Sequence, residues 1–137
     1  MNPLHIRKFI MGLNAVVNEH QSWAAIALNR RDLRAMPRHD LKRLDCISNL
    51  DAHKICKFGK WFRIHRQTFD YLDEARTREL KSDHYHMHEA ARIYYSNVEE
   101  NRAWYSQLVS RQSDVVDHLA YFKSKSNNLL RYALPFY

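Results

Sequence analysis

The chain contains little glycine and proline, with two glycines and three prolines among its 137 residues. So few residues of either kind argue against an all-β domain, which needs many turns. No run of apolar residues is long enough to span a bilayer, and the N-terminus lacks the apolar segment of a signal peptide. We therefore expect an all-α, cytoplasmic protein with no membrane contact.

Cysteine is also scarce, because the chain carries only Cys46 and Cys56. Two cysteines in a reducing cytosol are not expected to form a disulfide. Histidine, in contrast, is abundant at nine residues. A cysteine in such a chain is better interpreted as a metal ligand or a reactive thiol than as half of a structural bridge.

The net charge of +7 raises the question of nucleic-acid binding. No aromatic interleaving, recognition-helix pattern or glycine-rich loop accompanies the basic residues, so we disfavour nucleic acid as a partner and interpret them as a solvated face. Their densest run comprises Arg30, Arg31, Arg34, Arg38, Lys42 and Arg43.

Apolar residues recur at helical spacing along most of the chain. They predict helices from Pro3 to about Arg30, from Cys46 or Ile47 to Arg63, from about Arg76 to Glu100, and from Arg102 to Tyr132. Gly59 is expected to mark a bend or a close backbone contact, with a break of the second helix near it. Polar connections are expected at Arg31–Asp45, interrupted by Pro37, and at His65–Ala75. The expected architecture is an antiparallel four-helix bundle, with residues 1–137 forming one domain and no output domain.

The expected helices carry continuous inward-facing stripes. The first has Phe9, Leu13, Val16, His20, Trp23 and Ala27 at alternating steps of four and three. The third has Leu80, His84, Met87, His88, Ala91, Tyr94, Tyr95 and Val98. The last has Leu108, Val115, Leu119, Phe122, Ser126, Leu129 and Ala133, a stripe so regular that we expect part of it to serve a second subunit in a homodimer.

His84 and His88 lie four residues apart, so in a helix their imidazoles project from one face. His86 points roughly 200° away from either and is left out. Two further ligands, His20 from the first helix and Cys56 from the second, would complete a set of four. Taken alone, these residues also fit hydrogen-bonded core histidines, so both interpretations stay open.

Four protein ligands imply a particular chemistry. Imidazoles and a thiolate favour Zn²⁺, and a closed tetrahedron leaves no position for an activated water. We therefore expect sensing or structure and not an enzyme. A metalloenzyme would need an open position and a general base; Glu89 adjoins His88, but it faces roughly 100° away in a helix.

The order of three motifs resembles the chemoreceptor zinc-binding (CZB) domain. These motifs are His20-x-x-Trp23, Cys56-x-Phe58-Gly59-Lys60-Trp61, and His84-x-x-x-His88 followed by Glu89-Ala90-Ala91. They span about Val16 to Val98. The run His84-x-His86-Met87-His88 is particularly similar to the N-terminal zinc-sensing domains of zinc-inhibited bacterial diguanylate cyclases.

The resemblance implies a zinc site of His20, Cys56, His84 and His88 in a helical bundle, within a bacterial and usually homodimeric sensor. It further implies control of a signalling partner of the diguanylate cyclase or chemoreceptor type. In some members the zinc-bound cysteine also responds to oxidants such as hypochlorous acid. Two alternatives are a purely structural, zinc-stabilised helical interaction protein and a basic nucleic-acid-binding protein.

Overall fold

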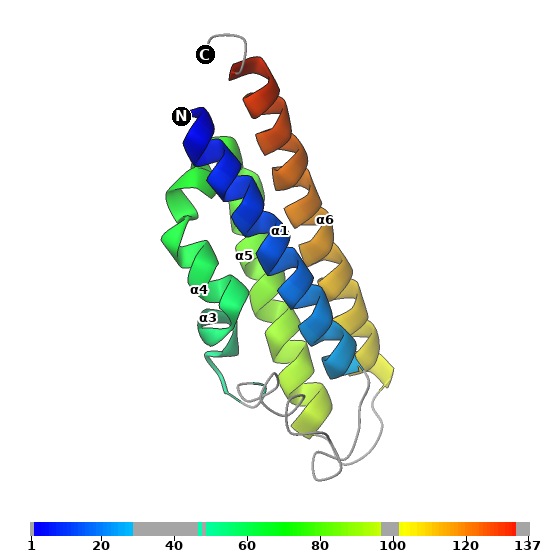
Figure 1. Ribbon diagram of the computed structural model, residues 1–137. Helices are drawn as coiled ribbons and strands as arrows, with labels where there is room; N and C mark the ends of the chain where they lie inside the picture. The colour runs from blue at the N-terminus through cyan, green and yellow to red at the C-terminus, as the bar shows by residue number, and fades with distance from the viewer. Residues whose placement is uncertain (1, 29–46, 48, 97–101, 134–137) are drawn as a thin grey trace.

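A computed structural model of the protein describes residues 2–28, 47, 49–96 and 102–133. All elements in this part of the chain are helices. Three long helices, α1 (Pro3–Leu28), α5 (Arg66–Ser96) and α6 (Arg102–Ala133), pack together, and the short helices α3 (Ala52–Ile55) and α4 (Lys57–Ile64) lie alongside them (Figure 1). The expected all-α class is confirmed, whereas the antiparallel four-helix bundle stays a prediction.

α1 begins as its sequence predicts. Pro3 occupies the first turn, where its missing N–H costs nothing. The Asn2 side chain accepts a hydrogen bond from the His5 amide at 3.1 Å and so caps the helix. All six residues of the expected stripe are buried, so the spacing correctly identified the inner face of α1: Phe9, Leu13, Val16, His20, Trp23 and Ala27.

The second expected helix is shorter and interrupted at a different place. Helix begins only at Ala52, and the break falls at Cys56, which has an extended backbone with φ −67° and ψ 158°. The sequence predicted a break near Gly59, and the structure places it three residues earlier. Leu50, an apolar residue within the expected second helix, is 73% exposed, because it lies in the turn before α3.

The segment expected to connect the second and third helices is itself helical. α5 already begins at Arg66, because Phe69 and Leu72 are buried against the core one turn apart. Its helical geometry is interrupted at Asp73, where φ is −168°. The Asp73 carboxylate accepts a hydrogen bond from the Arg76 amide at 3.0 Å, so it caps the following segment. This second start lies near the Arg76 boundary that the sequence predicted.

α6 matches its predicted bounds to within one residue. Five residues of its stripe are at most 1% exposed: Leu108, Val115, Leu119, Phe122 and Ser126. They are covered within the chain, where α6 contacts α1 and α5. A second subunit would consequently have to use other surface than this part of the stripe.

The core is aromatic near the chain termini and rich in histidine farther along α1. Phe9 stacks on Trp61 with ring centroids 5.3 Å apart and meets Phe69 edge-on at 5.1 Å. Phe69 in turn contacts Phe122 at 4.8 Å. These contacts join α1, α4, α5 and α6. The buried histidines lie farther along the bundle, on α1 and α5.

A polar cluster joins α5 to α6. Asp83 accepts hydrogen bonds from Arg111 at 2.7 Å and from His118 Nε2 at 2.8 Å. The other ring nitrogen of His118 accepts from Arg76 at 2.8 Å. Because an arginine can only donate, the His118 proton lies on Nε2 and points to Asp83. The cluster thereby fixes the α5–α6 register beside His84.

Several sequence-based expectations concern residues outside the described part of the chain. They are the basic run from Arg30 to Arg43, the connection around Pro37 and the placement of Cys46. Val98 in the expected α5 stripe also lies outside it. Among the helices that the structure describes, none combines the length and apolarity needed to cross a membrane.

Candidate metal centre

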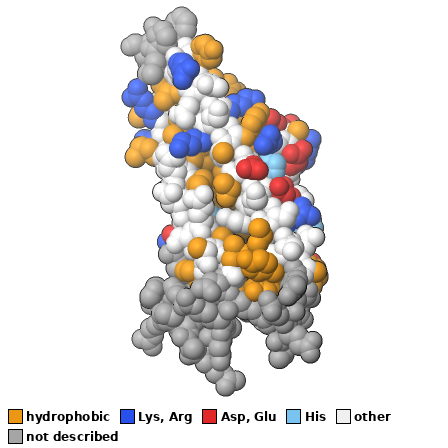
Figure 2. All heavy atoms as spheres, turned by 90° about the vertical axis from the view of Figure 1, so that its right-hand side faces the viewer, with side chains coloured by type: hydrophobic (Ala, Val, Ile, Leu, Met, Phe, Trp, Pro, Cys, Tyr) orange, Lys and Arg blue, Asp and Glu red, His pale blue; other side chains and the backbone are white. Residues whose placement is uncertain are grey.

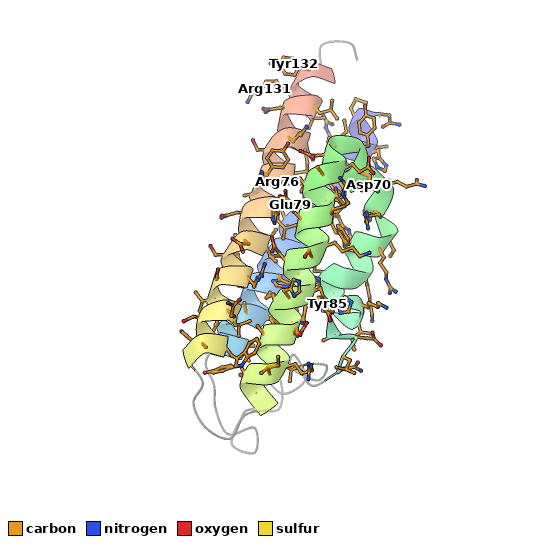
Figure 3. All side chains as sticks on the ribbon, turned by 180° about the vertical axis from the view of Figure 1, so that it is seen from behind. Asp70, Arg76, Glu79, Tyr85, Arg131 and Tyr132 are labelled. Carbon is orange, nitrogen blue, oxygen red and sulfur yellow. The ribbon has the colours of Figure 1, made fainter. Side chains whose placement is uncertain are left out.

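Three of the predicted ligands converge from two helices. His20 projects inward from α1, while His84 and His88 project from successive turns of α5. Tyr85, which follows His84 in the sequence, is labelled on α5 in Figure 3. Their exposed fractions are 5%, 4% and 3%. In the described chain, one nitrogen from each lies within 4.8 Å of the other two, which makes a group that can hold a metal ion.

The spacing of these atoms fits a zinc ion. Zn–N bonds of about 2.05 Å at tetrahedral angles place two nitrogens about 3.3 Å apart. The Nε2 atoms of His84 and His88 lie 3.1 Å apart. Because no pair of the group is farther apart than 4.8 Å, the His20 nitrogen would have to move by at most about 1.5 Å relative to the others.

Cys56 lies beside this group. Its Sγ is 3.4 Å from His84 Nε2, and a tetrahedral zinc site with a Zn–S bond of about 2.3 Å requires about 3.6 Å between sulfur and nitrogen. The structure thus brings His20, His84 and His88 into one buried group, with the half-buried Cys56 next to it. His86 lies on the exposed side of α5, as predicted.

The local backbone explains why Cys56 is placed there. Its extended conformation separates α3 from α4, and its sulfur accepts a hydrogen bond from the Gly59 amide at 3.2 Å. Cys56 is therefore the N-cap of α4. An amide donor at a helix N-terminus also suits the negative charge of a thiolate. The same sulfur lies 3.9 Å from the His53 carbonyl oxygen, to which a protonated thiol can donate.

Burial keeps the three imidazoles neutral. It lowers the pKa of His20 to about 4, partly opposed by the side chain of Gln112. Burial, followed by the influence of His20 and His53, lowers the pKa of His88 to about 3. The pKa of His84 is also held well below its usual value by burial, and then by His88 and His20. Neutral imidazole is the form that binds a metal, so the site is ready for an ion at neutral pH.

Unsatisfied polar atoms gather at this site. Buried side-chain polar atoms without a hydrogen-bond partner in the described chain are both ring nitrogens of His20, Nδ1 of His88, Nε1 of Trp23 and Oε1 of Gln112. Such atoms are rare in folded proteins because each costs about 1–3 kcal/mol. An ion coordinated by His20 would remove part of this cost, so the donor set fits a metal.

Aromatic side chains enclose the histidines. The Trp23 ring lies 4.8 Å from that of His88, and the Phe58 ring lies 4.7 Å from that of His84. This packing orients the imidazoles and excludes water. Low local polarity strengthens the attraction between an ion and its ligands.

Gln112 is a part of the site that the sequence interpretation missed. It is 9% exposed and lies between Leu108 and Val115 in α6. The stripe of α6 steps seven residues at this point, and position 112 is the one that a regular four-then-three spacing would fill. A polar residue at an inward position was therefore the available signal.

The chemistry of the group depends on Cys56. With the thiolate as fourth ligand, the tetrahedron is closed and no water is activated. Glu89, the acid nearest in sequence, is engaged at the surface: it lies 4.0 Å from the His86 ring and raises the pKa of Tyr85 through a hydrogen bond. Glu89 therefore does not provide a general base beside His20, His84 and His88.

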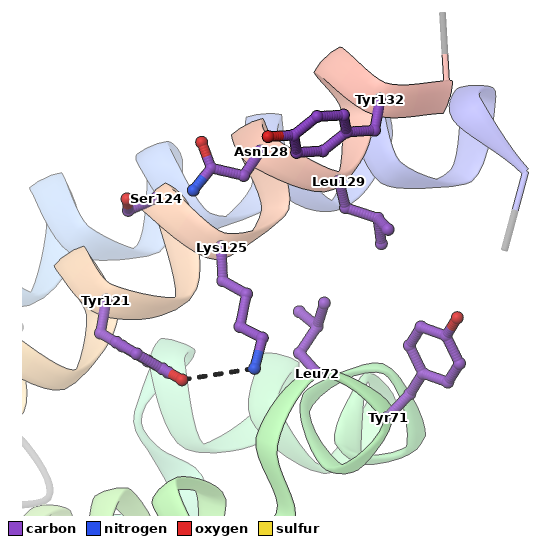
Figure 4. Close-up of a pocket in the computed structure, with 8 residues that line it drawn as sticks. All are labelled: Tyr71, Leu72, Tyr121, Ser124, Lys125, Asn128, Leu129 and Tyr132. Carbon is purple, nitrogen blue, oxygen red and sulfur yellow. Dashed lines mark hydrogen bonds between the residues drawn. The ribbon is translucent and has the colours of Figure 1, made fainter.

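A separate pocket of about 590 Å³ lies between α5 and α6 (Figure 4). Tyr71, Leu72 and Leu129 line it, and Lys125 donates a hydrogen bond to Tyr121 at 3.4 Å on its wall. Twelve residues of α5 separate Leu72 from His84, a rise of about 18 Å along a helix. This pocket is therefore not part of the metal centre.

Figure 2 shows hydrophobic side chains gathered toward one end of the face that it presents.

Comparisons with family models, with curated proteins and with solved structures give no match to this chain.

Proposed function

We propose that the protein is a zinc-binding regulatory module with a closed site of His20, Cys56, His84 and His88. The observation that carries the proposal is the concentration of partnerless buried nitrogens on His20 and His88, next to a cysteine sulfur at metal-site spacing. Three imidazoles and one thiolate form a donor set that suits Zn²⁺ better than hard cations.

The motifs shared with the CZB domain support the same assignment. In this proposal the helices act as an antiparallel four-helix bundle, the protein is a cytoplasmic homodimer, and it controls a signalling partner of the diguanylate cyclase or chemoreceptor type. Exposed apolar residues of α6, Tyr105 and Val109, offer surface for the second subunit, since the buried stripe of α6 is already covered.

Zinc would act by joining elements that are otherwise separate. His20 belongs to α1, Cys56 to the junction of α3 and α4, and His84 and His88 to α5. Binding favours the arrangement in which these three parts converge, and loss of zinc releases the constraint. A partner that contacts these helices would read the difference.

Metal content tests the first step. Native mass spectrometry of protein purified without chelator should find about one zinc per chain, and zinc added to chelator-treated protein should restore it. Protein that contains no zinc and takes up none would refute the proposal.

Cobalt substitution tests the ligands. Co²⁺ bound by a thiolate gives an intense near-ultraviolet charge-transfer band, which Cys56→Ser should abolish and His86→Ala should retain. If the wild-type complex lacks the band, three imidazoles hold the metal alone, and a site with an open position replaces the closed one.

A purely structural role for zinc is the competing interpretation, favoured by the deep burial of the triad. Far-UV circular dichroism and small-angle scattering, recorded before and after chelation, separate the two. Regulation predicts that the helix content persists while the shape of the dimer changes. Loss of the helical signal on chelation would support the structural role alone.

A further inference from the structure

A second pocket, of about 400 Å³, lies where α3, α4 and α5 meet, and one of its walls is His84. Its volume falls in the range of small-molecule sites, about 300–1,000 Å³. Four of its lining residues are cations: Lys54, Arg63, Arg66 and Lys81.

The charge of this pocket is only partly compensated. Asp51 lies 3.8 Å from Lys54, and Asp70 accepts a hydrogen bond from Arg66 at 3.1 Å. Within the described residues, no carboxylate forms an ion pair with the two remaining cations of the lining, Arg63 and Lys81. The pKa of His53 in the lining is lowered by burial and then by Lys54, against an opposing effect of Asp51, and Lys81 adds a smaller lowering effect.

The lining also offers apolar surface. Phe62 is the apolar side chain of the lining, and Gly59 adds only backbone. The guanidinium of Arg66 lies 5.6 Å from the centre of the Phe62 ring. A ligand that fits such a pocket combines a negatively charged group for Arg63 and Lys81 with an apolar part for Phe62. An inorganic oxoanion would satisfy the first requirement and leave most of the space empty.

We propose that this pocket binds a small organic anion bearing a phosphate or carboxylate group, held by Arg63 and Lys81 against Phe62. Guanidinium and ammonium groups are the usual partners of both kinds of anion. The residues that would hold the anion are not among the proposed zinc ligands, so the proposal does not rest on the proposed function. Because His84 is a wall of both sites, an occupant would lie next to the metal ligands.

Isothermal titration calorimetry on the full-length protein as purified tests the proposal, with phenyl phosphate and benzoate as probes at fixed ionic strength. At least one probe should bind at a single saturable site, and more tightly than inorganic phosphate because of its ring. The Arg63→Gln, Lys81→Gln double variant should weaken binding at least tenfold. The neutral analogue benzyl alcohol should bind at least tenfold more weakly than the better anion.

A matched control removes the same charges from the same helices. Lys60→Gln on α4 and Arg78→Gln on α5 replace one lysine and one arginine that do not line the pocket. This double variant should bind the probe within twofold of the wild type. Equal weakening in both double variants would show a general effect of net charge, and equal affinity for benzyl alcohol would show an apolar pocket. Either result, or the lack of saturable binding of both anions, would overturn the proposal.

Discussion

The carbonyl oxygen of His53 occupies the space in which a side chain on Gly59 would begin. Three residues earlier, Cys56 turns the chain so that this close approach occurs. The obstacle is backbone, which cannot rotate away as a flexible side chain can. The requirement for glycine in the Cys56-x-Phe58-Gly59 motif is therefore steric, and it acts on the segment that places the cysteine sulfur.

Gly59→Ala should consequently destabilise the protein by about 1–3 kcal/mol, the usual cost of overpacking. Helix propensity alone predicts the opposite, a gain of about 1 kcal/mol. Urea unfolding measures the change in the free energy of unfolding and gives its sign. Gln67→Ala, at an exposed position of α5, is the control and should change stability by less than about 0.5 kcal/mol. An alanine variant more stable than the wild type would contradict the steric account.

Zinc affinity should distinguish the histidines of α5. His88→Ala removes a proposed ligand and should weaken zinc binding at least about 100-fold, beyond the effect of losing a partner that only orients a ligand. His86→Ala removes an imidazole two residues away on the exposed side and should leave affinity within about threefold of the wild type. Competition with a chromophoric chelator measures both. Similar affinities for the two variants would exclude His88 from the site.

The stability of the metal-free protein should fall as the pH is lowered from about 6.5 to 5. The unfolded histidines take up protons near pH 6.5, whereas burial holds the pKa of His20 at about 4 and that of His88 at about 3. Protons therefore favour the unfolded state throughout this interval, by up to about 1.4 kcal/mol per pH unit for each histidine.

Urea titrations with chelator present measure this slope. The contribution of each buried, neutral histidine to the free energy of unfolding is complete above pH 6.5. It is lost as the pH approaches the pKa of that histidine in the folded protein. His20→Asn should reduce the slope by about one proton, whereas His86→Gln, at an exposed position, should reduce it by much less. A slope unchanged by His20→Asn would show that this residue is protonated in the fold.

Asp83→Asn tests the polar cluster between α5 and α6. Asp83 accepts from both Arg111 and His118. An amide retains one acceptor and turns a donor toward the other partner. The variant should lose about 1–3 kcal/mol of unfolding free energy, the cost of an unsatisfied buried group. Asp117→Asn, on the exposed side of α6, controls for charge and should be nearly neutral in thermal and chemical denaturation.

Oxidation of Cys56 should release zinc. The thiolate sulfur attacks hydrogen peroxide and breaks its O–O bond, which gives a sulfenic acid and hydroxide, and the sulfenic acid is a poorer ligand. A zinc-responsive dye should report release from the wild type and from Cys46→Ser. In Cys56→Ser the peroxide should cause no additional release. Peroxide-dependent release from Cys56→Ser would assign the effect to other groups.

Spacing along single helices predicted much of the arrangement. The stripe through Phe9, His20 and Ala27 is buried as expected, and the four-residue step from His84 to His88 placed both imidazoles on one face. These features depend on a local period that the sequence displays directly. The start of α6 at Arg102 was likewise predicted correctly.

Features set by contacts between distant segments were not predicted. Helix continues through the expected connection because Phe69 packs on Phe9 and Phe122, which no local pattern reveals. The pairing of Asp83 with His118 joins residues 35 positions apart.

The sulfur of Cys56 already accepts a hydrogen bond from the Gly59 amide and so caps the N-terminus of α4. Any cation that attracts this sulfur must share it with the peptide chain. Binding or loss of the ion would then act directly on the first turn of α4, without any intermediate residue. Metal coordination and the capping of α4 would therefore depend on the same sulfur atom.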